Sequence, residues 1–304
     1  MSTLRRLSET FSGRYLAPGA RVSVVAPAGP FAVEDFEHGI ARLRSRYDVH
    51  YQPDVVERAG YLAGDDARRL AELQRALDDD GVDAIIAARG GYGATRLLSR
   101  LDFAPLRRRP KLLVGFSDIS ALHAQWARAR LLSVHGTMVA ALGRCEQQLY
   151  ERHRAALEGQ FVERFSGLTT IATGRAEGVL LGGNLTVLSA LLGTPYALPT
   201  AGAILFFEDI GERPYRLDRM LTQWHDAGAF AAVSGIVLGA FVQADPGPDQ
   251  VGAAEVLAER LGDLGIPVLS GLPAGHIDDN AELAFGRRVL LDGARGELQL
   301  SPLP

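Results

Sequence analysis

The hydrophobic pattern in the first half of the chain alternates between strand-like and helix-like segments. Apolar runs typical of buried strands lie at residues 21–26, 82–88 and 112–116. Segments with helical spacing lie at residues 34–46 and 65–78, and the second places Leu70, Leu73 and Leu77 on one face. Strands that alternate with helices predict an α/β domain, in which a parallel sheet carries helices on both faces.

Three of the predicted turns follow strands of this sheet. They lie at residues 27–30, 90–93 and 115–118, and glycine or proline opens or closes each one. Ligands of open parallel sheets bind beyond the carboxyl ends of the strands. We therefore expect these three turns to meet there and to form a site.

The pattern changes between residues 150 and 178, where a charged helical segment gives way to a glycine- and threonine-rich stretch. Strand candidates then become more frequent, at residues 178–181, 203–207, 235–241, 267–269, 289–292 and 297–300. Helical spacing recurs at residues 185–192, 214–226 and 250–261. We place a domain boundary near residue 170, which gives domains at residues 1–170 and 171–304.

Composition narrows the class of protein. Apolar residues make up 47% and charged residues 22% of the 304 positions, as in ordinary globular proteins. The formal net charge of -4 gives no sign of a nucleic-acid partner. Cys145 is the only cysteine, which excludes an internal disulfide and a thiolate metal cluster. The N-terminus lacks a signal-peptide core, and no apolar stretch is long enough for a membrane span, so we expect a cytoplasmic protein.

The segment from Lys111 to Ser120 carries the most specific chemical signal. It predicts a strand, a sharp turn at Ser117 and then a helix, which is the arrangement of a nucleophile elbow. Gly115 permits the tight bend. The match to G-x-S-x-G is partial, because Ile119 occupies the last position. The alternative is that Ser117 is an ordinary helix N-cap.

The glycine-rich turn at residues 90–93 can present bare backbone N–H groups to an anion. It is consistent with a phosphate cradle, with part of an oxyanion hole, or with a tight turn that has no ligand. It lacks the lysine of a P-loop and the spacing of a dinucleotide fingerprint.

A serine nucleophile requires a base and a group that orients the base. His135 and His276 both follow apolar runs and flank glycine, and their positions favour neither. The remaining helical histidines are expected to pack, in the case of His123, or to lie on solvated helix faces, as for His38, His153 and His225. Glu208 and Asp209 end an apolar strand, so either could orient the base, or one could cap the helix that Pro214 opens. No zinc-peptidase motif is present, and we expect no metal.

Six motifs together resemble the LD-carboxypeptidases, a serine peptidase family that includes muramoyltetrapeptide carboxypeptidases and microcin C self-immunity peptidases. The motifs appear in the family's order and span residues 22–286. They are Ala-Arg-Gly-Gly-Tyr-Gly (88–93), Gly-Phe-Ser-Asp (115–118), Leu-Gly-Gly-Asn-Leu (181–185), Phe-Glu-Asp-Ile-Gly-Glu (207–212), Tyr-Arg-Leu-Asp-Arg-Met-Leu (215–221) and Gly-Leu-Pro-Ala-Gly-His (271–276).

This resemblance implies a catalytic triad of Ser117, His276 and Glu208, with the amides of Gly91 and Asp118 as the oxyanion hole. It implies an N-terminal parallel-sheet α/β domain that carries the nucleophile and a smaller β-rich C-terminal domain that carries the other two triad residues. It requires no metal and no organic cofactor, and it implies a homodimer.

The implied activity is removal of the terminal D-alanine from muropeptide tetrapeptides during peptidoglycan recycling. Arg89 and Asn184 are our candidates for binding the substrate's terminal carboxylate, and the alternative for Arg89 is a structural ion pair. One alternative is hydrolysis of peptidyl or aminoacyl nucleotides, which needs an aromatic platform for the base, whereas Trp126 and Trp224 are expected in the core. A second alternative is a non-catalytic muropeptide-binding protein.

The segment after His276 departs from the family pattern, because many members carry a threonine-leucine-proline run there. In this chain the segment contributes three acids, Asp278, Asp279 and Glu282. These acids could favour amino groups in the pocket, but we expect them to be solvated loop residues.

Overall fold

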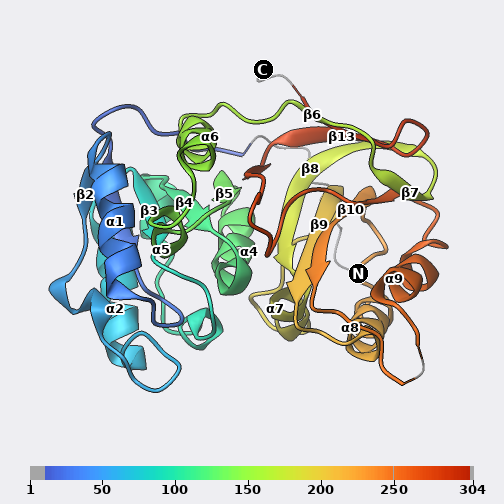
Figure 1. Ribbon diagram of the computed structural model, residues 1–304, viewed down its shortest axis with the longest axis horizontal. Helices are drawn as coiled ribbons and strands as arrows, with labels where there is room; N and C mark the ends of the chain where they lie inside the picture. Colours follow the sequence, from blue (N-terminus) through green and yellow to red (C-terminus); the bar gives the residue numbers. More distant parts are fainter. Residues whose placement is uncertain (1–10, 249, 302–304) are drawn as a thin grey trace. The chain divides into compact units, whose positions relative to one another are not determined.

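The computed structural model describes residues 11–248 and 250–301, which divide into two compact units (Figure 1). The N-terminal unit consists of residues 11–161 and a short return of the chain at residues 282–284. The C-terminal unit consists of residues 162–281 and 285–301.

The N-terminal unit is built on a six-stranded sheet in the order β12-β5-β4-β3-β1-β2. Its strands are β1 (Arg21–Val25), β2 (Asp48–His50), β3 (Ala84–Ala87), β4 (Leu112–Gly115), β5 (Ser133–His135) and β12 (Leu283–Phe285). The five strands from β5 to β2 pair in parallel. The helices are α1 (Val33–Arg44), α2 (Asp66–Asp78), α3 (Pro105–Arg108), α4 (Ser120–Arg128), α5 (Val139–Leu142) and α6 (Gln147–Leu157). The predicted α/β class is confirmed.

Local sequence explains why several helices and strands of this unit form where they do. Strands β3 and β4 are buried along their whole length, as expected for apolar runs in a parallel sheet. Asp65 is the N-cap of helix α2, because its carboxylate accepts a hydrogen bond from the Arg68 amide at 2.8 Å.

Helices α1 and α5 approach one another closely at two glycines. A Cβ atom at Gly39 would lie 2.0 Å from the carbonyl oxygen of Val139, and one at Gly143 would lie 1.9 Å from that of Asp35. No side chain fits at such distances, so glycine is required on both sides of this contact. The Ala140 amide in turn donates to the Ala88 carbonyl at 3.0 Å, which ties α5 to the end of β3.

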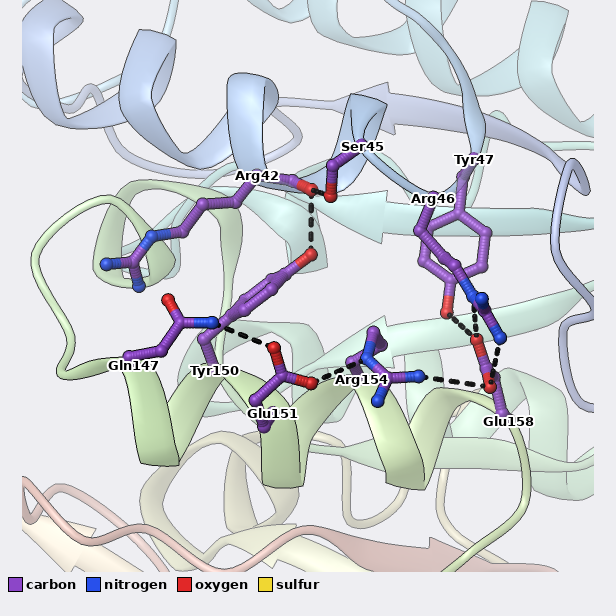
Figure 2. A network of polar contacts seen from close by, with 9 residues as sticks. All are labelled: Arg42, Ser45, Arg46, Tyr47, Gln147, Tyr150, Glu151, Arg154 and Glu158. Atoms are coloured by element: carbon purple, nitrogen blue, oxygen red, sulfur yellow. Dashed lines mark hydrogen bonds and ion pairs between the residues drawn. The ribbon is translucent and has the colours of Figure 1, made fainter.

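Helix α6 is attached to the end of α1 by a network of polar contacts (Figure 2). The Glu158 carboxylate accepts hydrogen bonds from the Arg46 guanidinium at 2.7 and 3.1 Å and from the Tyr47 hydroxyl at 3.2 Å. Arg46 holds the pKa of Glu158 below its usual value, despite the opposing effect of burial. The Tyr150 hydroxyl donates to the Arg42 carbonyl at 2.7 Å. The network joins segments about a hundred residues apart in the chain and fixes the last helix of the unit.

The C-terminal unit is built on an eight-stranded sheet in the order β6-β14-β13-β8-β9-β10-β11-β7. Its strands are β6 (Arg164–Phe165), β7 (Thr169–Ala172), β8 (Arg175–Asn184), β9 (Ala203–Ile210), β10 (Gly235–Val242), β11 (Val268–Ser270), β13 (Arg288–Asp292) and β14 (Glu297–Leu300). Strands β8 to β11 pair in parallel, and the outer strands pair antiparallel. Its helices are α7 (Leu185–Ala190), α8 (Pro214–Asp226) and α9 (Ala253–Leu261).

All six strand candidates of the second half coincide with strands of this sheet. Trp126 and Trp224 are fully buried, which confirms that both belong to the core. Among the described residues, no helix has the length and apolar character to cross a membrane.

We expect Gly39→Ala to destabilise the N-terminal unit. In an ordinary helix interior this change is favourable by about 1 kcal/mol, but here the methyl group would force α1 away from α5, at a cost of about 1–3 kcal/mol. Denaturant unfolding measures the difference from wild type. Gly252→Ala is the control, because a Cβ there meets no atom within 4 Å. A Gly39→Ala protein as stable as wild type would contradict the packing described here.

Candidate active site

Ser117 lies at the sharp turn that the sequence predicts between β4 and α4. Its φ of +63° is in the left-handed region, which is strained for a residue with a side chain. The Ser117 side chain caps neither the short 3₁₀ turn Ser117–Ile119 nor α4, whose N-cap positions are Phe116 and Ile119. The N-cap alternative is therefore wrong, and the backbone has the strained geometry of a nucleophile elbow.

Two buried side chains, those of His123 and Ile119, stabilise this strained turn. The His123 ring bridges the Gly115 carbonyl and the Ser133 hydroxyl, at 2.8 Å on each side. Burial lowers the pKa of His123 to about 4, so the ring is neutral and Nε2 donates to Gly115. A Cβ at Gly115 would lie 3.0 Å from the side chain of Ile119, so this isoleucine packs directly against the bend. His123 packs as expected and is a structural residue.

The glycine-rich turn lies directly against Ser117. A Cβ at Gly90 would lie 2.9 Å from Ser117 Cβ and 3.1 Å from its Oγ, so only glycine leaves room for the serine side chain. The Ala94 amide donates to Asp118 Oδ2 at 2.8 Å, which fixes the other end of the turn. Burial raises the pKa of Asp118 to about 6, and the amide hydrogen bond partly opposes this shift.

The third predicted turn joins the other two. The Gly29 amide donates to the Gly90 carbonyl at 2.9 Å, and a Cβ at Gly91 would lie 3.0 Å from Gly29 Cα. Arg89 is exposed and donates a hydrogen bond to the Pro30 carbonyl. The expected meeting of the three turns at the carboxyl ends of the strands is confirmed. Gly91 and Asp118, whose amides we expect to form an oxyanion hole, both belong to this cluster.

Glu208 and His276 form a hydrogen-bonded pair in the C-terminal unit. Glu208 is on β9 and fully buried, whereas the His276 side chain, on the loop after β11, retains 16% exposure. His276 Nδ1 lies 2.6 Å from Glu208 Oε2. Burial raises the pKa of Glu208, and the contact with His276 opposes this effect. A carboxylate that accepts from Nδ1–H leaves Nε2 as the basic atom of the ring, as in serine hydrolases.

The loop that carries His276 is held close to Glu208 by the preceding residue. The Gly275 amide donates to Asn280 Oδ1 at 2.8 Å. Gly275 has a φ of +126°, and a Cβ there would lie 2.9 Å from Glu208 Oε2. Glycine is therefore needed twice at this position, for the backbone conformation and for the carboxylate.

Asp209 is occupied by structural hydrogen bonds. It accepts from the Thr186 amide and hydroxyl at 2.8 and 2.9 Å, and from the Asn184 side chain at 3.0 Å. Asn184 is itself buried, and its oxygen caps α7 by accepting from the Val187 amide at 3.0 Å. The two adjacent acids thus differ in environment, and Glu208 is the one that contacts a histidine. The other histidine candidate, His135, is buried on β5 with its ring 5.5 Å from that of Phe116.

Two expectations about solvated residues are wrong. His153 is fully buried rather than solvated, and its Nδ1 lies 3.3 Å from Glu282 Oε1. Glu282, expected in a solvated loop, is buried at this contact and also accepts from Arg152 Nε at 3.1 Å. Asp278 and Asp279 are exposed, as expected. The spacing of His153 from Tyr150 and Leu157 is the signal that places it on the buried face of α6.

Within residues 11–248 and 250–301, no group of three or more histidine, cysteine or acidic side chains could hold a metal ion.

Two family models match the chain. Residues 22–136 match the LD-carboxypeptidase N-terminal domain, and residues 177–291 match the LD-carboxypeptidase C-terminal domain. The resemblance inferred from the six motifs is confirmed.

Two curated relatives match over nearly the whole chain. A Streptomyces coelicolor protein named as a carboxypeptidase is 43% identical over 295 residues, which cover 94% of each chain. The murein tetrapeptide carboxypeptidase of Pseudomonas aeruginosa is 33% identical over 292 residues, which cover 90% of this chain and 94% of that protein.

Solved structures share the fold. The muramoyltetrapeptide carboxypeptidase of Oxalobacter formigenes superposes with a TM-score of 0.80 at 31% identity, over 94% of this chain and 100% of that one. The microcin C7 self-immunity protein MccF, in complex with aspartyl sulfamoyl adenosine, gives a TM-score of 0.85 at 22% identity, over 96% of this chain and 98% of that one.

We expect Gly275→Ala to break the hydrogen bond between His276 and Glu208, because the added methyl group would displace the carboxylate. The measurement is proton NMR of the low-field His276 Nδ1–H resonance, which should be lost or shifted while the circular dichroism spectrum is retained. Gly271→Ala is a matched control, because Gly271 also has a positive φ, of +87°, but has open space around its Cβ position. An unchanged resonance in Gly275→Ala would contradict this geometry.

Proposed function

This chain belongs to the LD-carboxypeptidase family, and we propose that it is the serine carboxypeptidase that removes the terminal D-alanine from murein tetrapeptides. The observation that carries the proposal is the strained backbone of Ser117, which lies where the family motif Gly-Phe-Ser-Asp places the nucleophile. The names of the Pseudomonas aeruginosa and Oxalobacter formigenes relatives support this class of substrate.

The proposed mechanism is acyl transfer to serine. Ser117 Oγ attacks the carbonyl of the L-configured residue before D-alanine, and His276 Nε2 accepts the hydroxyl proton. Glu208 holds the ring through Nδ1 and stabilises its charged form. The amides of Gly91 and Asp118 donate to the developing oxyanion. His276 then protonates the departing amine, and water hydrolyses the acyl-enzyme by the same steps in reverse.

Recognition of a free terminal carboxylate distinguishes a carboxypeptidase from an endopeptidase. We assign this role to Arg89, which is exposed and lies next to Gly90, the residue that touches Ser117. Asn184 is the second candidate. Its side chain is already hydrogen-bonded to Asp209 and to the first turn of α7. If it binds the substrate carboxylate, it does so while these groups hold it in place.

The cellular setting follows from the substrate. Murein tetrapeptides released from the cell wall are recycled inside the cell, so we propose a cytoplasmic location and a role in peptidoglycan recycling. A homodimer is part of the same proposal, since it is carried over from the family.

The competing substrate class is an aminoacyl or peptidyl nucleotide. MccF structures hold aspartyl sulfamoyl adenosine and glutamyl sulfamoyl guanosine. Sequence identity to these structures is 21–22%, against 31–33% to the two relatives named for murein or muramoyl tetrapeptides. The two tryptophans are buried, so neither can stack on a nucleotide base. The higher identity to the relatives named for murein or muramoyl tetrapeptides therefore favours a murein tetrapeptide as the substrate.

Ser117→Ala should abolish hydrolysis of an N-acetylmuramoyl tetrapeptide while the fold is retained, because no other group in the proposed site replaces the nucleophile. We expect kcat to fall by about 10⁴-fold or more. Mass spectrometry of the substrate follows the loss of one alanine.

The control for this experiment is Ser45→Ala, the same chemical change at an exposed position at the end of α1, which should retain activity within about twofold. Alanine release by Ser117→Ala at the wild-type rate would refute the assigned nucleophile. Hydrolysis of aspartyl sulfamoyl adenosine, with no loss of alanine from the tetrapeptide, would refute the substrate.

A further inference from the structure

Two tyrosines that the catalytic mechanism does not use form an exposed aromatic pair in the N-terminal unit. Tyr61 and Tyr92 are 65% and 48% exposed, whereas most large apolar side chains of the unit are buried. Their ring centroids are 5.8 Å apart, and the ring planes are inclined by 55°. Exposed aromatic surface that is gathered in one place is typical of a binding site.

The position of Tyr92 is fixed relative to the proposed nucleophile. It follows Gly91 directly and lies between two anchored residues of the glycine-rich turn. Gly90 lies against Ser117, and the Ala94 amide is hydrogen-bonded to Asp118. The Tyr92 ring therefore projects from the segment that we propose binds the oxyanion.

The residue after Tyr61 packs against the same glycine-rich turn, at Gly93. This residue, Leu62, lies 2.8 Å from the position that a Cβ at Gly93 would occupy. The Ala63 amide donates to the Ala28 carbonyl at 2.9 Å. Both rings are thus carried by backbone that is fixed at neighbouring residues, so the pair is a preformed surface.

The charged groups beside the rings are ion-paired with one another. Arg96 lies near both phenols, and its guanidinium donates to Asp66 Oδ2 at 2.7 and 3.0 Å. The hydrogen bond from Arg96 is the main cause that lowers the pKa of Asp66, so the carboxylate remains ionised. Asp66 also forms an ion pair with Arg69, which is fully buried, so Arg96 is the exposed cation of this cluster. Apolar ring faces with hydrogen-bonding groups at their edge suit a ligand that has both apolar faces and hydroxyl groups.

We infer that Tyr61 and Tyr92 form a subsite for the N-acetylated amino sugar at the N-terminal end of a glycosylated peptide substrate. This inference rests on the proposed function. Three extended residues span at most about 10 Å, so a sugar joined to the peptide two residues before the reacting one lies within reach of rings next to Gly91. The apolar faces of the sugar would pack on the rings, and its hydroxyl and acetamido groups would bond to the phenols and Arg96.

The consequence is selectivity within one class of substrate. A glycosylated tetrapeptide should bind more tightly than the same peptide without its sugar, and the difference should depend on the aromatic rings. The test uses full-length protein that carries Ser117→Ala, which prevents turnover. Isothermal titration calorimetry measures the binding of an N-acetylmuramoyl tetrapeptide and of the free tetrapeptide.

Adding Tyr61→Ala should weaken binding of the N-acetylmuramoyl tetrapeptide roughly 3- to 10-fold, the factor expected for the loss of one aromatic contact. Binding of the free tetrapeptide should change less than about twofold. Tyr61→Phe keeps the ring and should retain most of the affinity for the sugar-bearing ligand. Tyr215→Ala is the matched control, because Tyr215 is a 54% exposed tyrosine on α8 of the other unit.

Equal weakening of both ligands would overturn the inference, since the pair would then bind the peptide. No effect on either ligand, or no binding of either, would overturn it as well. Failure of the proposed function gives a different result: wild-type protein would not release alanine, yet the sugar-selective effect of Tyr61→Ala would persist. If wild-type protein releases alanine but Tyr61→Ala has no sugar-selective effect, the subsite is refuted and the proposed function stands.

Discussion

The left-handed backbone of Ser117 is the constraint on which the N-terminal unit depends. A non-glycine residue in this region costs about 1–3 kcal/mol, so surrounding contacts must hold it there. His123 supplies a neutral, buried bridge to the Gly115 carbonyl. Gly90 leaves space for the serine side chain. Asp118 accepts a hydrogen bond from the Ala94 amide, at the end of the glycine-rich turn that contains Gly90. The hydroxyl of this strained residue lies at the carboxyl edge of the parallel sheet.

The C-terminal unit meets a second constraint, the burial of a carboxylate. Removing Glu208 from water disfavours its charged form, and the hydrogen bond from His276 offsets part of that penalty. The neighbouring Asp209 is also buried, and it is bound by Thr186 and Asn184. Two adjacent acids therefore have different tasks: one orders the start of α7, and the other orients an imidazole.

Much of the fold could be predicted because its signals are local. The apolar runs before the turns at residues 27–30, 90–93 and 115–118 mark the parallel strands, and Ser117 was identifiable from its position after one of them. The choice of His276 over His135 came from family resemblance, since local pattern does not reveal which histidine meets a carboxylate. The burial of His153 was missed because its partner, Glu282, is 129 residues away in the chain. The pairing of Tyr61 with Tyr92 likewise depends on the packing of two loops.

The central claim is that Ser117 is an activated nucleophile whose reactivity depends on the Glu208–His276 pair. Peptide mapping by mass spectrometry, after reaction with a small fluorophosphonate, tests it most directly. We expect one adduct, on Ser117, which forms much more slowly in His276→Ala protein although the fold is intact. An adduct on another residue, or modification of Ser117 at an unchanged rate without His276, would contradict it.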